Sequence, residues 1–253
     1  MFDLIKLRWF HNRPFIRDLR NAAPPPEFPG FPELREDKCP GCDHCAEVCP
    51  TRAIQAHPLR LDLGRCIFCR DCVRACPAGA IAFTNRHRLG TTSREALVTA
   101  SGQSADVYEA SGIAARREIH RLFGRSLKLR QVSAAGCNGC EMELAAAGNV
   151  NFDMGRYGID FVASPRHADG VVITGPVSRN MAPALRDTYL AVPQPRLVIA
   201  AGACAISGGI FAESPELDRT FFDKVPVDLF VPGCPPHPLT FIQAVLKFIG
   251  RMD

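Results

Sequence analysis

Two stretches of the chain repeat one pattern, CPGCDHCAEVCPTRAIQA at residues 39–56 and CIFCRDCVRACPAGAIAF at residues 66–83. They align without a gap at an offset of 27 residues, and the four cysteines, the proline after the fourth cysteine and an Ala-Ile pair coincide. Each copy reads C-x2-C-x2-C-x3-C-P. A repeat of this kind indicates two copies of one structural unit, so the cysteine spacing decides the fold of the first half.

This spacing resembles that of the bacterial two-cluster ferredoxins. There, three cysteines at three-residue intervals hold one 4Fe–4S cluster, and the fourth cysteine holds the cluster of the other copy. One predicted ligand set is Cys39, Cys42, Cys45 and Cys76, and the other is Cys66, Cys69, Cys72 and Cys49. Backbone amides between the cysteines can donate hydrogen bonds to the sulfurs, which helps to set the reduction potential.

Structural zinc sites and disulfide bonds are the alternative interpretations of these cysteines. C-x2-C pairs also form zinc ribbons, but zinc requires neither the triple spacing nor the duplication. Disulfide frameworks belong to short secreted chains. The N-terminus, MFDLIKLRWFHNRPF, lacks an uninterrupted apolar stretch, a small-residue cleavage site and a twin-arginine pair, so we expect an intracellular chain with reduced thiols.

The composition sets wider limits. The chain has 253 residues, of which 12 are cysteines, with 47% hydrophobic and 22% charged residues. This is enough for one large or two modest domains and excludes a disordered chain. No apolar run approaches the roughly 18 residues that a membrane span needs. The net charge of +4 does not indicate nucleic-acid binding, and we expect no such partner.

Two segments flank the ferredoxin-like domain, predicted at residues 36–84. Residues 1–35 combine an apolar and basic amphipathic helix with a Pro-rich connector, and the helix would lie on a membrane surface, on a membrane subunit or on a soluble one. Residues 85–126 are more polar, show no strand pattern and read as a partly helical linker. The helices expected in this linker cover residues 93–100 and 112–126.

The remainder, residues 127–253, alternates short apolar runs with helical stretches, which predicts an α/β domain with a doubly wound parallel sheet. The expected strands are residues 127–133, 158–164, 170–175, 196–202 and 227–233. The expected helices are residues 138–149, 179–191 and 238–250.

The other four cysteines follow three of these strands. Cys137 and Cys140 come after the first predicted strand, Cys204 after the fourth and Cys234 after the fifth. The carboxyl ends of parallel strands form one edge, so we expect the four thiols to converge there. Four convergent thiolates can hold zinc or a third 4Fe–4S cluster, and the two ferredoxin-type sites in the same chain favour the cluster.

Four segments in this half carry a family resemblance: AAGCNGCEMEL (134–144), ASPRHADGVVITGPVSRNMAPALR (163–186), GACAISGGIF (202–211) and VPVDLFVPGCPPHP (225–238). They resemble the small subunit of group 4 NiFe hydrogenases, a homologue of the B subunit of respiratory complex I. The resemblance implies a flavodoxin-like fold and a proximal 4Fe–4S cluster on Cys137, Cys140, Cys204 and Cys234. The C-x2-C form CNGC favours the hydrogenase branch, since the complex I protein typically has two adjacent cysteines there.

The segment LGRCIFCRDCVRACP (63–77) is similar to the ferredoxin-type subunits of formate hydrogenlyase and complex I. The chain therefore resembles a fusion of two usually separate subunits with three 4Fe–4S clusters. The resemblance implies an electron-transfer subunit of a membrane-associated, formate-hydrogenlyase-like complex, peripheral on the cytoplasmic face of the inner membrane. Implied partners are a NiFe large subunit, membrane subunits and an electron donor, either a formate dehydrogenase or a soluble carrier.

Two other functions stay open at this point. One is the equivalent electron-wire subunit of a complex-I-like NADH–quinone oxidoreductase, and the other is a scaffold with purely structural metals. Because three clusters use all 12 cysteines, the catalytic centre is expected on a partner subunit. We find no nucleotide or flavin site, since the Gly-rich stretch 202–211 matches neither a dinucleotide fingerprint nor a phosphate loop.

Five further side chains carry expectations. The resemblance assigns Glu143 a position near the cluster at the large-subunit contact, where we predict proton transfer, whereas Glu141 reads as a helix-surface residue. Arg166 and His167 are expected to brace a loop or an interface. His237, close to Cys234, is expected to be a loop histidine or to tune the cluster through a hydrogen bond.

Overall fold

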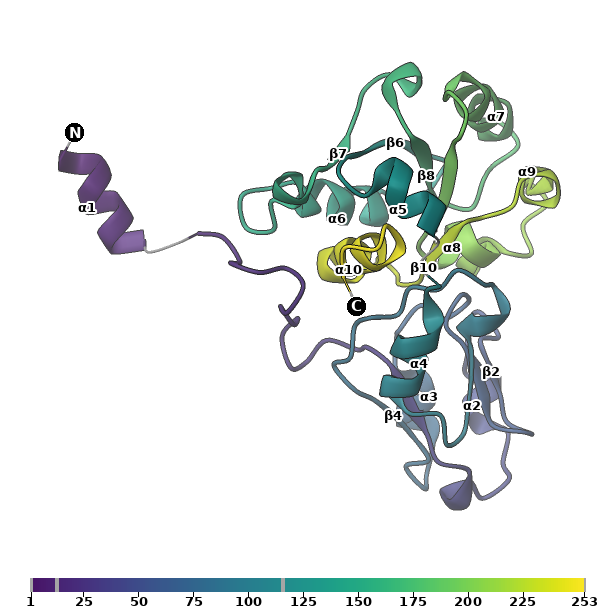
Figure 1. Ribbon diagram of the computed structural model, residues 1–253. Coiled ribbons are helices and arrows are strands. Elements are labelled where there is room, and N and C mark those ends of the chain that lie inside the picture. Colours follow the sequence, from purple (N-terminus) through teal and green to yellow (C-terminus); the bar gives the residue numbers. More distant parts are fainter. Residues whose placement is uncertain (1, 12–13, 115–116, 253) are drawn as a thin grey trace.

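The computed structural model describes residues 2–11, 14–114 and 117–252. Figure 1 shows two bodies packed end to end, with one short helix set apart from both. The cysteine-rich part runs from β1 to α4 (residues 32–112), and the sheet part runs from α5 to α10 (residues 117–248). Residues of the predicted N-terminal segment, linker and last domain that lie outside the described ranges are Met1, Asn12, Arg13, Ala115, Arg116 and Asp253.

The sheet part contains a five-stranded parallel sheet in the order β10-β9-β8-β6-β7. Counted along the chain, this order is 2-1-3-4-5, the order of flavodoxin-like sheets. The expected α/β domain with a parallel sheet is therefore confirmed, and each predicted strand contains an observed one. The strands are β6 (Leu127–Ser133), β7 (Ile159–Phe161), β8 (Gly170–Thr174), β9 (Leu197–Ala201) and β10 (Leu229–Val231).

Helices cover both faces of this sheet because its strands are apolar on both faces. In β8, Val171 and Ile173 pack into one core, whereas Val172 packs into the other, as the alternation of side chains along a strand requires. One face is covered by α5 (Arg117–Phe123), α6 (Gly139–Ala147) and α10 (Pro238–Phe248). The other face is covered by α7 (Met181–Ala191), α8 (Ala203–Ser207) and α9 (Thr220–Lys224).

The cysteine-rich part consists of short elements around the two repeats. Strands β1 (Pro32–Leu34) and β4 (Ile81–Phe83) pair antiparallel. Strands β2 (Ile54–Gln55), β3 (Arg60–Asp62) and β5 (Val98–Ala100) form a second antiparallel sheet. Helices α2 (His44–Glu47) and α3 (Asp71–Ala75), one from each repeat, contact each other.

The helix predicted over residues 93–100 is wrong. The chain makes a single 3-10 turn at Glu95–Leu97 and then continues as β5 beside β3. Thr99 is buried there, and its hydroxyl donates a hydrogen bond to the Leu61 carbonyl at 3.1 Å. The free edge of β3 offers backbone partners that local propensity cannot anticipate. Helix α4 (Ala105–Gly112), which follows, is capped by the Ser104 hydroxyl.

The two parts share one hydrophobic core. Tyr108 of α4 is 1% exposed, packs against Phe31 and donates its hydroxyl hydrogen to the Leu89 carbonyl. These residues belong to the same core as Val171 of β8. Thr91 and Phe230 exchange two backbone hydrogen bonds, so the predicted linker also adds a bridge to β10 at the sheet edge. The cysteine sites of the two parts are therefore held in a defined relation.

The N-terminal segment is anchored to the sheet part, but its helix is not packed on it. Gln243 of α10 donates hydrogen bonds to the carbonyls of Leu19 and Ala22, and Leu19 is fully buried. Helix α1 (Phe2–His11) lies apart from both bodies (Figure 1), and its large apolar side chains are 52–89% exposed. None of the helices in the described ranges combines the length and the apolar character that a membrane span needs.

His87 lies near the junction of the two parts, and we expect it to make the stability of the folded chain sensitive to acid. Its side chain is 6% exposed, and its Nε2 has no hydrogen-bond partner among the described residues. Burial, together with the charge of Arg88, lowers the pKa of His87 to about 4. Below pH 6.5 the unfolded chain binds a proton that the folded chain refuses until about pH 4, so stability falls as the pH drops through this window.

The loss at pH 5 is about 2 kcal/mol, at 1.36 kcal/mol per pKa unit. We expect the substitution His87→Leu to reduce the drop in Tm between pH 7.5 and pH 5 by several degrees, measured by thermal unfolding at a fixed scan rate. The matched control is His167→Leu, which changes an exposed histidine and should leave the drop unchanged. An undiminished drop in His87→Leu contradicts this assignment.

Candidate metal centre

The four cysteines of the sheet part meet at the carboxyl edge of the sheet. Cys137 lies in the loop after β6 and Cys140 in the first turn of α6, while Cys204 lies in α8 after β9 and Cys234 follows β10. Burial, then the charges of Glu141 and of the other three thiols, raise the pKa of Cys140 to about 12. Burial and the neighbouring thiols also raise the pKa of Cys204 to about 11. Thiols in this state need a bound cation to favour their ionised, metal-binding form.

Glycines let these loops approach one another. Gly202 has a φ of +92°, and a Cβ built on it would lie 2.6 Å from the Cys140 sulfur. Gly209, with a φ of +56°, would bring its Cβ within 2.9 Å of the Cys204 sulfur. Any side chain at Gly202 would therefore occupy space next to a predicted ligand, in a backbone conformation that favours glycine.

Glu141 is buried, and the expectation that it is a surface residue is wrong. Its side chain is 9% exposed, and Oε1 accepts hydrogen bonds from the Ser133 hydroxyl at 2.7 Å and the Thr174 hydroxyl at 2.6 Å. Burial opposes ionisation, but these hydrogen bonds outweigh it and lower the pKa of Glu141. The carboxylate thus ties the start of α6 to the ends of β6 and β8. In the sequence, the signal that could have indicated a buried acceptor was a hydroxyl residue near the end of each of two predicted strands, Ser133 and Thr174.

Glu143 follows Met142 in helix α6, and its side chain is half-buried. Burial raises the pKa of Glu143. A carboxyl whose pKa is raised in this way holds a proton more readily at neutral pH, which is the property that a proton donor needs.

The cysteines of the two repeats also lie in groups. Burial is the main cause that raises the pKa of Cys66 to about 12, and the charges of Cys72, Cys49 and Cys69 add to it. Cys49, from the first repeat, lines one pocket together with Cys66, Cys69 and Cys72 of the second repeat. Burial likewise raises the pKa of Cys45, with contributions from Cys39 and Cys76.

The repeated Ala-Ile pair has a structural reason. The Cys49 sulfur accepts a hydrogen bond from the Ala53 amide at 3.2 Å, and the Cys76 sulfur accepts the equivalent bond from the Ala80 amide at 3.3 Å. The Cys66 sulfur accepts another from the Phe68 amide. Amide hydrogen bonds to thiolate sulfurs are the donors that stabilise the charge of iron–sulfur clusters.

Within the described ranges, no three His, Cys, Asp or Glu side chains are grouped closely enough to hold a single metal ion. The potential metal ligands are nevertheless all of one kind. Each group consists of thiols, and three of the sulfurs accept hydrogen bonds from backbone amides. Thiolate ligands select zinc, Cu(I) or iron–sulfur clusters. The residues present therefore fit thiolate-bound iron–sulfur groups.

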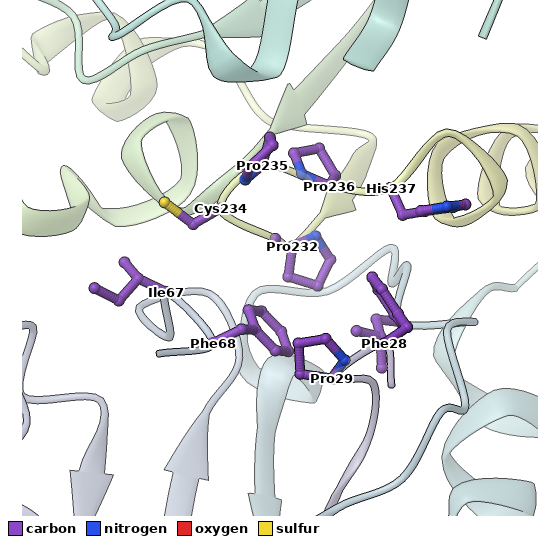
Figure 2. Close-up of a pocket in the computed structure, with 11 residues that line it drawn as sticks. Phe28, Pro29, Ile67, Phe68, Pro232, Cys234, Pro235, Pro236 and His237 are labelled. Atoms are coloured by element: carbon purple, nitrogen blue, oxygen red, sulfur yellow. The ribbon is translucent and has the colours of Figure 1, made fainter. Parts of the chain in front are cut away.

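A pocket of about 200 Å³ lies at the junction of the two parts. Figure 2 shows Ile67 and Phe68 of the cysteine-rich part on one side and Cys234 with its flanking prolines on the other. The charge of Cys69 is among the causes, after burial and Cys137, that raise the pKa of Cys234. The segment between Cys66 and Cys69 thus faces Cys234 of the sheet part across this junction.

Of the remaining predicted residues, His237 is packed and hydrogen-bonded, whereas Arg166 and His167 are exposed. His237 caps α10 through Nδ1, which accepts a hydrogen bond from the Leu239 amide, and its ring lies edge-on to Phe28 and Phe152. This is the geometry of a loop-bracing histidine. Arg166 and His167 lie exposed in the 3-10 turn Pro165–His167.

Comparison with known proteins agrees with this arrangement. Residues 38–81 match the model of the 4Fe-4S dicluster domain, and residues 137–248 match the model of the NADH ubiquinone oxidoreductase 20 kDa subunit. The probable membrane-bound hydrogenase subunit mbhJ of Pyrococcus furiosus is 40% identical over 135 residues, covering 53% of this chain and 81% of that protein. The chain belongs to the 20 kDa subunit family.

Two further relatives of this 20 kDa subunit family member are informative. The B subunit of NADH-quinone oxidoreductase from Geotalea daltonii is 42% identical over 113 residues, which cover 45% of this chain and 66% of that protein. Formate hydrogenlyase subunit 7 of Escherichia coli is 42% identical over 130 residues, with 51% of each chain covered. The predicted fusion of a dicluster segment with this subunit, in an oxidoreductase context, is confirmed.

Proposed function

We propose that the chain carries three 4Fe–4S clusters and relays electrons to the NiFe large subunit of a membrane-associated group 4 hydrogenase of the formate-hydrogenlyase type. The observation that carries the proposal is the gathering of the cysteines: Cys49 lines one pocket with three cysteines of the other repeat, and the four cysteines of the sheet part lie at one edge of the sheet. The proposed ligand sets are Cys39, Cys42, Cys45 and Cys76; Cys49, Cys66, Cys69 and Cys72; and Cys137, Cys140, Cys204 and Cys234.

The order of the three centres follows from two links between the groups. The charge of Cys45 acts on the Cys72 thiol, which joins the first group to the second. The charge of Cys69 acts on the Cys234 thiol, which joins the second group to the third. Electrons would therefore pass from the first repeat's centre through the second to the proximal centre in the sheet part.

Each cluster, when bound, supplies a one-electron redox centre. The chain's own residues set its surroundings: backbone amides donate hydrogen bonds to the Cys49 and Cys66 sulfurs, and Phe68 lines the pocket at the junction with the sheet part. Glu143 is proposed to exchange protons with the partner subunit, because burial favours its protonated form. The catalytic centre lies on that partner, since the three sets use all 12 cysteines.

The proposed domains are residues 36–84, with a ferredoxin-like α+β fold, a connecting segment at 85–126 and the family domain at 127–253, preceded by residues 1–35. Antiparallel strand pairs and the contact between α2 and α3 support the ferredoxin-like assignment. We place the chain on the cytoplasmic face of the inner membrane, bound to the large and membrane subunits. A formate dehydrogenase or a soluble carrier supplies the electrons.

The same series of redox centres can serve a complex-I-like quinone oxidoreductase, and the 42% identity to the Geotalea daltonii protein favours that second candidate. The spacing of Cys137 and Cys140, which are not adjacent, favours the hydrogenase. Hydrogen evolution by the purified complex separates the two.

The test of the proposal is the iron content and the EPR spectrum of the anaerobically purified chain. We expect about twelve iron atoms per chain and three low-potential 4Fe–4S signals after reduction with dithionite. About eight iron atoms, bound zinc, or clusters that dithionite cannot reduce would contradict it.

A further inference from the structure

Arg219, which precedes α9, is a largely buried cation beside the third group of cysteines. Its guanidinium donates hydrogen bonds to four backbone carbonyls, those of Pro176, Cys204, Ala205 and Ile206, at 2.8–3.2 Å. Three of these carbonyls belong to α8, the short helix that carries Cys204. The planar, forked guanidinium thus satisfies carbonyls of that helix and fixes the backbone that presents the Cys204 sulfur.

The positive charge of Arg219 is not cancelled by an ion pair. Among the described residues, no carboxylate lies within salt-bridge distance of its guanidinium; the other charges that act on it are those of Asp223 and Arg94. Its other close neighbour is the Phe222 ring, 4.7 Å from the guanidinium carbon. Its Nη1 donates a hydrogen bond to the Cys204 carbonyl at 3.1 Å, which places the charge beside the residue that carries a proposed ligand. A partly buried charge is screened less than an exposed one, so its field reaches the thiols.

We propose that Arg219 is a positioning residue that holds the Cys204 loop and raises the reduction potential of the proximal centre. The inference rests on the proposed function, because it requires a cluster on Cys204. Reduction adds one electron to a centre that already carries the negative charge of four thiolates. A fixed positive charge nearby stabilises the reduced form more than the oxidised form, and local charge is one of the factors that set cluster potentials.

Arg196 is a matched control for Arg219. It also donates to backbone carbonyls at the end of a helix, those of Tyr189 and Val192, and its guanidinium lies 4.1 Å from the centre of the Tyr189 ring. It directly precedes β9 and therefore lies at the opposite edge of the sheet from the cysteines. Arg196 thus shares the bracing chemistry of Arg219 without its position beside the thiols.

The experiment is an EPR-monitored redox titration of the full-length chain and of the variants Arg219→Met, Arg219→Lys and Arg196→Met. For Arg219→Met we expect one of three signals to shift to lower potential, with the oxidised-to-reduced ratio changed at least tenfold at a fixed potential, which is about 59 mV for one electron. The other two signals should not move. Arg219→Lys keeps the positive charge but loses the forked set of N–H donors. Its third signal should therefore stay near the potential of the parent chain.

Three outcomes overturn the proposal: an unshifted third signal in Arg219→Met, an equal shift in Arg196→Met, or an equal shift in Arg219→Lys. If Arg219→Met does not assemble the third cluster, the reduction potential of Arg219→Lys decides between the two explanations. A role limited to holding the Cys204 loop predicts a shifted potential in Arg219→Lys, whereas an effect of the positive charge predicts an unshifted one. Failure of the proposed function is distinguishable from these results, because the parent chain would then lack the third signal and its four iron atoms.

Discussion

The substitution Gly202→Ala is expected to remove about four of the roughly twelve iron atoms per chain and one of the three EPR signals. A Cβ at this position would lie 2.6 Å from the Cys140 sulfur, a separation that real side chains do not adopt. The φ of +92° adds backbone strain that only glycine avoids. Both effects displace the Cys140 and Cys204 loops from each other, so the third ligand set cannot close around a cluster. The measurements are iron analysis and EPR after dithionite reduction.

The matched control for this change is Gly102→Ala. Gly102 has a φ of +80°, but a Cβ there would meet no atom within 4 Å. It therefore carries similar backbone strain without the contact with a cysteine, and we expect it to retain all three signals. A full iron complement in Gly202→Ala would contradict the predicted role of this glycine. Loss of a cluster in Gly102→Ala would show that strain alone suffices.

Glu141→Ala is expected to lower the free energy of unfolding by about 3 kcal/mol. The substitution removes the acceptor of two hydroxyl hydrogen bonds, from Ser133 and Thr174, at a site where Glu141 is 9% exposed. Hydrogen bonds to a buried carboxylate are worth more than neutral ones, and the hydroxyls left behind have less water to replace them. The measurement is Tm at a fixed scan rate, for which a decrease on the order of 10 °C is expected.

Glu143→Gln, on the same helix, is the control for stability and the test of the proposed proton role. Glu143 is half-buried, so we expect little change in Tm, within about 0.5 kcal/mol. In the assembled complex, however, hydrogen evolution should fall at least about tenfold, because glutamine cannot exchange a proton. Unchanged turnover would remove Glu143 from the mechanism, and a Tm loss equal to that of Glu141→Ala would contradict the distinction between the two residues.

Much of the sheet part was predictable because its local patterns agree with its fold. The run 127–133 predicted β6 at its observed ends, and the run 170–175 predicted β8. Buried parallel strands are apolar on both faces and stand out against polar connections. The helix expected over 93–100 failed for the opposite reason, since β5 forms on the edge of a strand more than 30 residues earlier in the chain.

The site divides in the same way. Ligand spacing is a local property, so the repeats alone predicted that Cys49 joins the cysteines of the other copy, and the structure places it in one pocket with Cys66, Cys69 and Cys72. The roles of Glu141 and Arg219 depend on partners that are distant in sequence, such as Thr174 for the carboxylate and Pro176 for the guanidinium. Neither residue carries a motif of its own, and the sequence pattern even suggested that Glu141 is exposed.

The sequence by itself predicted three groups of four cysteines and determined the α/β class of the second half, because coordination chemistry dictates ligand spacing and burial dictates hydrophobic period. Only the tertiary structure decided how the groups are joined. The shared core and the bridge between Thr91 and Phe230 bring Ile67 and Phe68, which lie between Cys66 and Cys69 in the sequence, to face Cys234. Long-range packing selects such a junction, and no local pattern in either half encodes it.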